Sequence, residues 1–207
     1  MTAEDKKSHW ETVYAGKPLE KMSWYETRPG VSWELMQELN ISPDAGVIDI
    51  GGGDSLFTDF LLSRGFTDLS VLDISENALQ RARERMGERG NKVNWIASDV
   101  TSFQPERKYD LWHDRAALHF LSSPEDRKAY ARIARAALRP NGALIVGTFS
   151  DTGPEKCSGL TVQRFSEEDM TLLFQDSFRK VKCLRRRHAT PTGAAQDFLF
   201  CSFRAMS

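Results

Sequence analysis

Short apolar runs alternate with turns and amphipathic stretches along most of the chain. Val47, Ile48 and Ile50 form the first of these runs, and their β-branched side chains predict a buried strand of a parallel sheet. Three glycines end the run, and residues 55–64 then carry apolar side chains at helical spacing. The pattern predicts a strand, a glycine turn and a helix, which is the opening unit of a doubly wound α/β fold.

The alternation of predicted strands and helices continues toward the C-terminus. Further parallel strands are predicted at 69–72, 92–97, 109–114 and 144–149, and helices at 29–39, 75–87, 123–138 and 166–176. The last two predicted strands, 178–187 and 196–203, are joined by a loop too short for a crossover helix, so they form an antiparallel hairpin. The sequence therefore predicts an α/β fold with a doubly wound, mostly parallel seven-stranded sheet, a C-terminal antiparallel hairpin and helices on both faces.

The first two strands place a glycine turn near an acidic residue. Glycines 51–53 permit positive φ and let the backbone approach a ligand closely. Asp73 ends the second predicted strand, where a doubly wound fold binds the hydroxyl groups of a ribose. These two features predict a nucleoside site.

The residues after the glycine turn argue against a dinucleotide. A dinucleotide fingerprint requires Gly or Ala in the sixth place counted from Gly51, and Leu56 stands there. Asp54, at the head of the next helix, is expected to repel a pyrophosphate where the helix dipole should attract one. The predicted ligand is a nucleoside without phosphates.

These motifs resemble those of a known family. Asp49-Ile50-Gly51-Gly52-Gly53 is similar to motif I of the class I S-adenosylmethionine-dependent methyltransferases, acid-x-Gly-x-Gly. Asp73 and Ser98-Asp99-Val100 match the acids after their second and third strands, and 138–143 resembles their Leu-x-Pro-x-Gly turn. The resemblance runs from residue 46 to the C-terminus. It implies S-adenosyl-L-methionine as the cofactor and methyl transfer as the activity.

The resemblance also implies roles for particular residues. Asp73 is expected to bind the ribose, and Asp99 the adenine amino group, with the backbone of Val100 at the ring. The alternative for Asp99 is a helix cap or turn residue. The residues predicted to bind the cofactor are Tyr14, Trp24, Tyr25, Asp49, Gly51, Gly53, Asp73, Ile74, Asp99, Val100 and His113.

Residues 8–30 are rich in aromatic side chains but show no clear period. One interpretation is a short helix and loop packed on the sheet edge. The other, which the resemblance favours, is a lid over the cofactor that uses Tyr14, Trp24 and Tyr25; an aromatic face near a sulfonium gains about 0.5–2 kcal/mol. The prediction is a single methyltransferase domain over 1–207, with a lid segment at 1–30 and a Rossmann-like core at 31–207.

Polar residues cluster at the end of the fourth predicted strand. Ligands bind beyond the carboxyl ends of the strands in such sheets, which places His113, Asp114 and Arg115 at the mouth of the site. His113 and Asp114 are the predicted catalytic residues, either of them acting as a base or an orienting group; a structural role for each histidine is the alternative. His119 and Phe120 lie a turn further on. No metal site is predicted, because these residues lack recognised ligand spacing.

The loop at 150–159 follows another strand end and is expected to overhang the acceptor pocket. Cys157 lies in it, and without a visible base partner it is predicted to be an ordinary thiol. Gln163 and Arg164 are further candidates for contact with the acceptor. The basic run at 185–188 is predicted to be solvated, with an anionic acceptor as the alternative.

Composition sets the remaining expectations. The hydrophobic content of 40% and charged content of 28% are typical of a globular domain, and a net charge of −1 draws the chain to neither nucleic acid nor an anionic membrane. Three widely spaced cysteines suit a reducing compartment better than a disulfide framework. No signal peptide or membrane-spanning run is visible. The predicted location is cytoplasmic.

The predicted function is S-adenosylmethionine-dependent methyl transfer to a small-molecule or protein side-chain nucleophile. Asp114-Arg115-Ala116 departs in two of three residues from the Asp-Lys-Gly of some protein-lysine methyltransferases, and no added recognition domain is present, which slightly favours a small molecule. The alternative is a non-catalytic cofactor-binding sensor or partner subunit, which predicts no open acceptor pocket. A dinucleotide oxidoreductase is a distant third. The sequence predicts no oligomeric state.

Overall fold

The computed structural model describes residues 2–206, and its main element is a seven-stranded sheet in the order β3-β2-β1-β4-β5-β9-β8. The strands are β1 Val47–Ile50, β2 Leu69–Asp73, β3 Val93–Ala97, β4 Tyr109–Arg115, β5 Leu138–Phe149, β8 Phe178–Ala189 and β9 Ala195–Ala205. Strands β1 to β5 pair in parallel, whereas β9 is antiparallel to both β5 and β8. The predicted fold class is confirmed.

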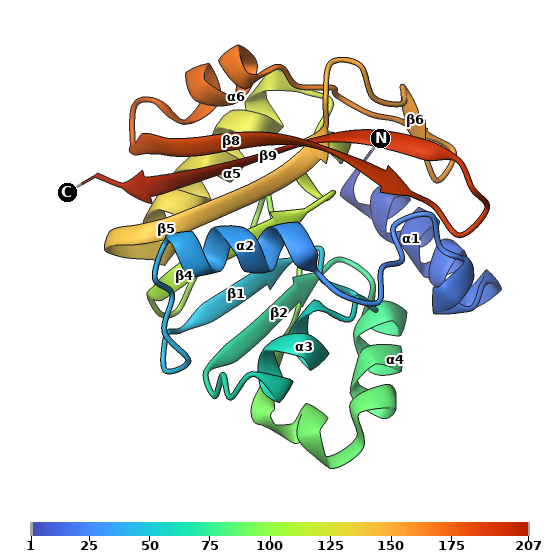
Figure 1. Cartoon of the computed structure of the whole chain (residues 1–207). Helices are drawn as coiled ribbons and strands as arrows, with labels where there is room; N and C mark the ends of the chain where they lie inside the picture. Colours follow the sequence, from blue (N-terminus) through green and yellow to red (C-terminus); the bar gives the residue numbers. More distant parts are fainter. Residues whose placement is uncertain (1, 207) are drawn as a thin grey trace.

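Helices cover both faces of the sheet (Figure 1). They are α1 Ala3–Gly16, α2 Gly30–Glu38, α3 Phe57–Ser63, α4 Glu76–Met86, α5 Pro124–Ala137 and α6 Glu167–Phe174. Short 3₁₀ helices occur at η1 Leu19–Lys21, η2 Gly87–Lys92 and η3 Leu118–Phe120. Helices α2, α3 and α4 share one core cluster, and α5 and α6 share the cluster on the opposite face. Within residues 2–206 no helix is long and apolar enough to cross a membrane.

Side chains alternate between the two faces along the central strands, as the pleat requires. Val47 and Leu111 face the α2 and α3 side, whereas Ile48 and Trp112 face the α5 side. The same alternation sends Asp49 and His113, which are register partners on β1 and β4, toward α2. Asp114 is therefore directed toward α5. Neighbours in the sequence thus serve opposite faces of the sheet.

The aromatic N-terminal segment contains a helix of 14 residues, α1, which begins with a capping box between Thr2 and Asp5. Figure 1 shows α1 beside the carboxyl ends of the parallel strands, next to α4. The Glu11 carboxylate accepts hydrogen bonds from the Glu76 N–H at 2.8 Å and the Asn77 N–H at 3.2 Å. Glu11 therefore supplies a negative charge at the N-terminus of α4, where the helix dipole favours one.

Two local differences from the sequence prediction concern turns. Strand β5 begins at Leu138, not at 144, because Leu138 already pairs with Tyr109 before an irregularity in the β4–β5 register. A two-stranded hairpin, β6 Lys156–Cys157 with β7 Leu160–Thr161, lies within and just after the predicted loop at 150–159. Both features depend on pairing partners that local sequence does not specify.

The cysteine prediction is wrong for one pair. Cys183 and Cys201 stand directly opposite each other on β8 and β9, with Cα atoms 4.1 Å apart, and form a disulfide. Cys157 is free and buried. The hairpin register brings residues separated by 18 positions together, so spacing alone did not reveal the pair. The cysteines therefore give no support to a reducing compartment.

Candidate active site

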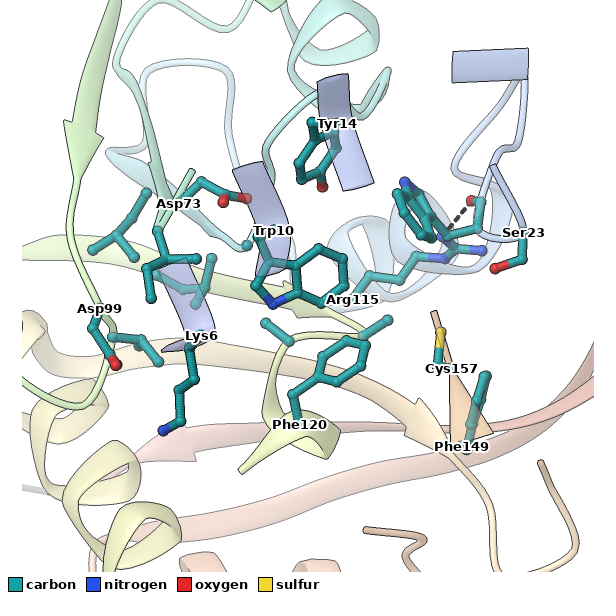
Figure 2. A pocket seen from close by; sticks show the side chains of 18 of the residues that line it. Lys6, Trp10, Tyr14, Ser23, Asp73, Asp99, Arg115, Phe120, Phe149 and Cys157 are labelled. Carbon is teal, nitrogen blue, oxygen red and sulfur yellow. Dashed lines mark hydrogen bonds between the residues drawn. The ribbon is translucent and has the colours of Figure 1, made fainter. Parts of the chain in front are cut away.

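Two adjoining cavities lie at the carboxyl ends of the parallel strands. Cavity 1, shown in Figure 2, is lined by α1, the loop before α2, the ends of β1, β2, β4 and β5, the loop after β3, and β9. Cavity 2 lies beside it, between η1, the loop before α2, the glycine turn, α3 and the end of β4. Trp24, Gly51 and Arg115 line both cavities. The position is the one that an open α/β sheet offers to a ligand.

Asp73 lines cavity 1 at the end of β2 and is only 5% exposed. Its Oδ1 accepts a hydrogen bond from the Ser75 N–H at 2.9 Å, and burial raises the pKa of this carboxyl to about 7. Gly53 has a φ of +39°, and a Cβ there would lie 2.7 Å from Asp73 Oδ2. Glycine at this position therefore leaves room for the carboxylate.

Asp99 lines the same cavity, in the loop that follows β3. Its Oδ1 accepts hydrogen bonds from the Thr101 N–H at 2.8 Å and the Thr101 hydroxyl at 2.7 Å, which fixes the loop. Ile74 and Val100 also line cavity 1. The fold thus brings together the residues that the sequence predicted after the second and third strands.

An aromatic wall closes cavity 1 on the α1 side. Figure 2 shows Trp10 between Tyr14 and Phe120, and the Trp10 and Phe120 ring centroids are 4.8 Å apart. Tyr14 and Trp24 line cavity 1 as well, whereas Tyr25 lines only cavity 2. Sequence reasoning missed Trp10; its i, i+4 spacing from Tyr14 puts the two rings on one helix face and was the available signal.

Asp54 does not face either cavity. Its carboxylate pairs with Arg85 and, at 3.0 Å, with Arg81, both from α4. Arg81 also donates to the carbonyls of Tyr14 and, at 3.0 Å, Lys17, and so ties the end of α1 to α4. The predicted repulsion of a pyrophosphate by Asp54 is therefore wrong, because two guanidinium groups neutralise this charge.

His113 lies in cavity 2 and is only 1% exposed. Its Nδ1 is 2.7 Å from Asp49 Oδ1, and its Nε2 is 2.8 Å from the Ser32 hydroxyl. The Phe57 ring stacks on the imidazole with centroids 3.8 Å apart. Asp49 Oδ2 is buried and has no hydrogen-bond partner within the described chain. Ser32, on α2, was not predicted from the sequence.

Asp114 lines neither cavity and has no exposed surface. Its carboxylate accepts hydrogen bonds from the Tyr130 hydroxyl at 2.7 Å, the Ala117 N–H at 2.8 Å and the Leu118 N–H at 3.0 Å. Burial raises the pKa of this carboxyl to about 6. This placement does not support the predicted catalytic role; it makes Asp114 the group that fixes the turn after β4.

Arg115 lines both cavities, and Figure 2 shows its hydrogen bond to the loop before α2. Its Nη1 donates to the Trp24 carbonyl at 2.8 Å, and its Nε is 3.3 Å from Glu26 Oε1. The guanidinium also lies 5.3 Å from the centre of the Phe198 ring. Arg115 therefore joins the end of β4 to the N-terminal segment and to β9.

Cavity 1 continues beyond Arg115 into a region lined by Phe149, Cys157, Gln196 and Phe198. Burial raises the pKa of the Cys157 thiol, in line with the ordinary thiol that the sequence predicts. The residues that line this region are aromatic or uncharged, and Arg115 stands at its border. It offers an apolar space next to the part of cavity 1 that Asp73 and Asp99 line.

Three further sequence candidates lie outside both cavities. The Gln163 side chain donates to the Arg164 carbonyl, and Arg164 pairs with Glu155 at 3.3 Å. His119 is buried, and desolvation together with Arg115 lowers its pKa to about 3. Phe120, the residue after His119, does line cavity 1. Within residues 2–206 no group of three or more His, Cys, Asp or Glu side chains is arranged to hold a metal ion.

The sheet order and the reversed last strand agree with the class I, Rossmann-like methyltransferase fold that the sequence resembles. Residues 47–142 match the family model described as a methyltransferase domain. The solved N-methyltransferase NodS from Bradyrhizobium japonicum, in complex with S-adenosyl-L-homocysteine, superimposes with a TM-score of 0.71 at 20% identity over 99% of this chain and 97% of that one. The predicted resemblance is confirmed.

Two curated relatives match part of the chain. EEF1A lysine methyltransferase 2 of Danio rerio is 35% identical over 54% of this chain, and malonyl-[acyl-carrier protein] O-methyltransferase 2 of Ilyobacter polytropus is 26% identical over 74%. The chain spans 51% and 62% of the lengths of these relatives. Their names point to different acceptors, so they indicate a reaction class and leave the acceptor of this chain open.

Proposed function

We propose that the protein transfers a methyl group from S-adenosyl-L-methionine to a small-molecule nucleophile. When bound, this cofactor supplies an electrophilic methyl group on a sulfonium. The residues of the site fit it: Asp73 would accept hydrogen bonds from the ribose hydroxyls, Asp99 would bind the adenine, and cavity 2 would hold the amino-acid half. Gly51, where the two cavities meet, lies where the halves of an elongated ligand would join.

The observation that carries the enzymatic proposal is the part of cavity 1 beyond Arg115. A sensor without catalysis needs space for the cofactor alone, whereas this cavity extends past the nucleoside region to Phe149 and Phe198. An apolar, partly closed space beside the reacting group orients an acceptor and excludes water. The cavity therefore favours an enzyme over a sensor or partner subunit.

The lining of this acceptor region also bears on mechanism. Its polar side chains are Ser23, Arg115, Cys157 and Gln196, and the described residues place no carboxylate or imidazole there. Catalysis then rests on positioning a nucleophile that already carries a free electron pair. A small acceptor suits the aromatic walls of this region. A protein lysine is the second candidate acceptor, suggested by the name of the Danio rerio relative.

Calorimetric titration with S-adenosylmethionine, S-adenosylhomocysteine and NAD in parallel tests the proposal. Micromolar binding of the first two and none of NAD is expected. Formation of S-adenosylhomocysteine with a panel of small amines, thiols, phenols and carboxylates then separates an enzyme from a sensor. Binding of NAD alone contradicts the proposal.

The affinity for S-adenosylmethionine is expected to rise about tenfold between pH 6 and pH 8. The pKa of Asp73 is raised by burial to about 7, and the ionised carboxylate is the stronger acceptor for ribose hydroxyls. The stability of the free protein shifts the other way: the contribution of Asp73 is present at low pH and is lost as pH rises through 7. Calorimetry and thermal unfolding across this range measure both; an affinity independent of pH contradicts the role of Asp73.

We propose that α1 and the loop to residue 30 act as a lid over cavity 1. The lid is held by Glu11 at the N-terminus of α4, by Arg81 at the end of α1, and by the Arg115–Glu26 pair. Trp10, Tyr14 and Trp24 are its contributions to the cavity wall. The Glu11 and Arg81 contacts come from partly exposed side chains, which suits a segment that opens to admit a ligand.

Replacing Glu11 with glutamine is expected to lower cofactor affinity about five- to tenfold, because the N–H groups at the start of α4 lose their charged acceptor. Hydrogen exchange in residues 3–16 should rise in the free variant. Glu4→Gln, an exposed change in the first turn of the same helix, is the matched control. Unchanged exchange and affinity in the Glu11 variant would show that this contact does not hold the lid.

A further inference from the structure

We propose that Ser32 and His113 form a positioning pair that holds the Asp49 carboxylate in place to bind an ammonium group in cavity 2. The ammonium is that of the amino-acid half of S-adenosylmethionine, so the inference rests on the proposed function. It assigns His113 to cofactor binding through Asp49 and not to proton transfer from the acceptor.

The hydrogen-bond directions follow from the chemistry of the groups. A carboxylate only accepts, so His113 Nδ1 carries a proton and donates it to Asp49 Oδ1 across 2.7 Å. In the neutral ring, Nε2 then accepts from the Ser32 hydroxyl across 2.8 Å. Both ring nitrogens are occupied, which fixes the imidazole and leaves it no free position for a substrate proton.

Packing against neighbouring groups also fixes the positions of Ser32, His113 and Asp49. Phe57 stacks on the imidazole at 3.8 Å and covers one face of it. Asp49 and His113 are register partners on adjacent parallel strands, so the sheet itself sets the distance between them. Ser32 is fully packed on α2, which lies over this face. The Asp49 carboxylate is thereby hydrogen-bonded to an imidazole whose own position is fixed by the sheet, by Phe57 and by Ser32.

The Ser32–His113 pair leaves the second carboxylate oxygen of Asp49 without a hydrogen bond. Oδ2 is buried and unpartnered within the described residues, and Asp49 as a whole is 3% exposed. A buried carboxylate oxygen without a donor is costly, and a cation with N–H donors relieves that cost. Asp49 lines cavity 2, and Gly51 lines both cavity 2 and cavity 1. An ammonium group carried by a ligand whose nucleoside lies in cavity 1 meets this requirement.

His113 is also in the wrong place for the acceptor. It lines cavity 2 only, whereas the acceptor region of cavity 1 lies beyond Arg115, toward β5 and β9. Between the two stands the Arg115 side chain, anchored to the Trp24 carbonyl. A role through Asp49 is therefore the one that the geometry allows.

Two ligands separate this role from a general effect on folding. S-adenosylhomocysteine carries the amino acid, and 5′-methylthioadenosine has the same nucleoside and thioether without it. His113→Leu, which removes the donor to Asp49, is expected to weaken binding of S-adenosylhomocysteine about tenfold, as loss of a charge-assisted hydrogen bond predicts. Binding of 5′-methylthioadenosine should stay within threefold of the wild type. Ser32→Ala should give the same selectivity with a smaller loss, about threefold.

His119→Leu is the matched control, because His119 is as buried as His113 but lines neither cavity. It should lower the melting temperature without changing the ratio of the two affinities. Equal weakening of both ligands in the His113 and Ser32 variants would overturn the inference, as would a wild type that binds both ligands equally well. A wild type that binds neither ligand contradicts the proposed function itself. If His113→Leu does not fold, the ratio of the two ligand affinities in Ser32→Ala decides between these outcomes.

Discussion

Asp73→Asn should weaken binding of S-adenosylmethionine by roughly 30- to 100-fold at pH 8, the largest loss expected from one change in this site. The carboxylate is ionised there, since its pKa is about 7, and hydrogen bonds to a charged acceptor contribute about 1.5–3 kcal/mol each. The loss of about 2–3 kcal/mol corresponds to that factor. Asparagine keeps an oxygen for the Ser75 N–H, so the start of α4 remains capped.

Calorimetry at pH 8 measures the loss of affinity, and calorimetry at pH 6 tests whether this loss comes from the charge of Asp73. The variant should have lost the rise in affinity with pH that the wild type shows, because the titrating group is gone. Asp110→Asn is the control, since Asp110 pairs with Arg139 at the opposite end of β4 from the cavities. An affinity within threefold of the wild type at pH 8 would remove Asp73 from the cofactor site.

Asp114→Ala is expected to lower the free energy of unfolding by about 3 kcal/mol while leaving cofactor affinity within threefold of the wild type. Three buried donors lose their acceptor, and each buried polar group left without a partner costs about 1–3 kcal/mol. The Tyr130 hydroxyl is the most affected, because it also accepts from the Trp112 indole at 2.9 Å and has no access to water.

Chemical denaturation of the wild type, Asp114→Ala, Tyr130→Phe and the double variant checks this prediction. A double-mutant cycle should give a coupling of about 1 kcal/mol or more between the two side chains, as expected for groups in direct contact. If Asp114→Ala unfolds like the wild type and loses only turnover, the original assignment of Asp114 to catalysis is correct and the structural role is not.

The positions of Asp73 and Asp99 beside cavity 1 could be predicted from local sequence. Asp73 follows a local pattern, since strand, glycine turn, helix and a second strand ending in an acid all lie within one short stretch. Asp99 was found in the same way, one strand later. Local patterns of this kind depend on side-chain period and turn chemistry, which act between near neighbours in the chain.

For His113 and Asp114, local sequence patterns were not sufficient to predict where the side chains lie. Both follow the same strand, and the sequence placed both at the mouth of the site. Their directions are opposite because alternate residues of a strand face opposite sides of the sheet. Which side holds the cavity depends on how β4 pairs with β1 and where α2 and α5 pack. The same long-range register produced the Cys183–Cys201 disulfide, which spacing did not indicate.

The sequence by itself determined the order of the strands and helices, the terminal hairpin and the strand-end acids that line cavity 1. Hydrophobic period, glycine turns and acids at strand ends are local properties of the chain. Only the tertiary structure decided that Ser32 reaches His113, that Trp10 closes cavity 1 and that Asp114 is a structural acceptor. These outcomes depend on contacts between segments far apart in the chain, and such contacts are set by strand register and helix packing.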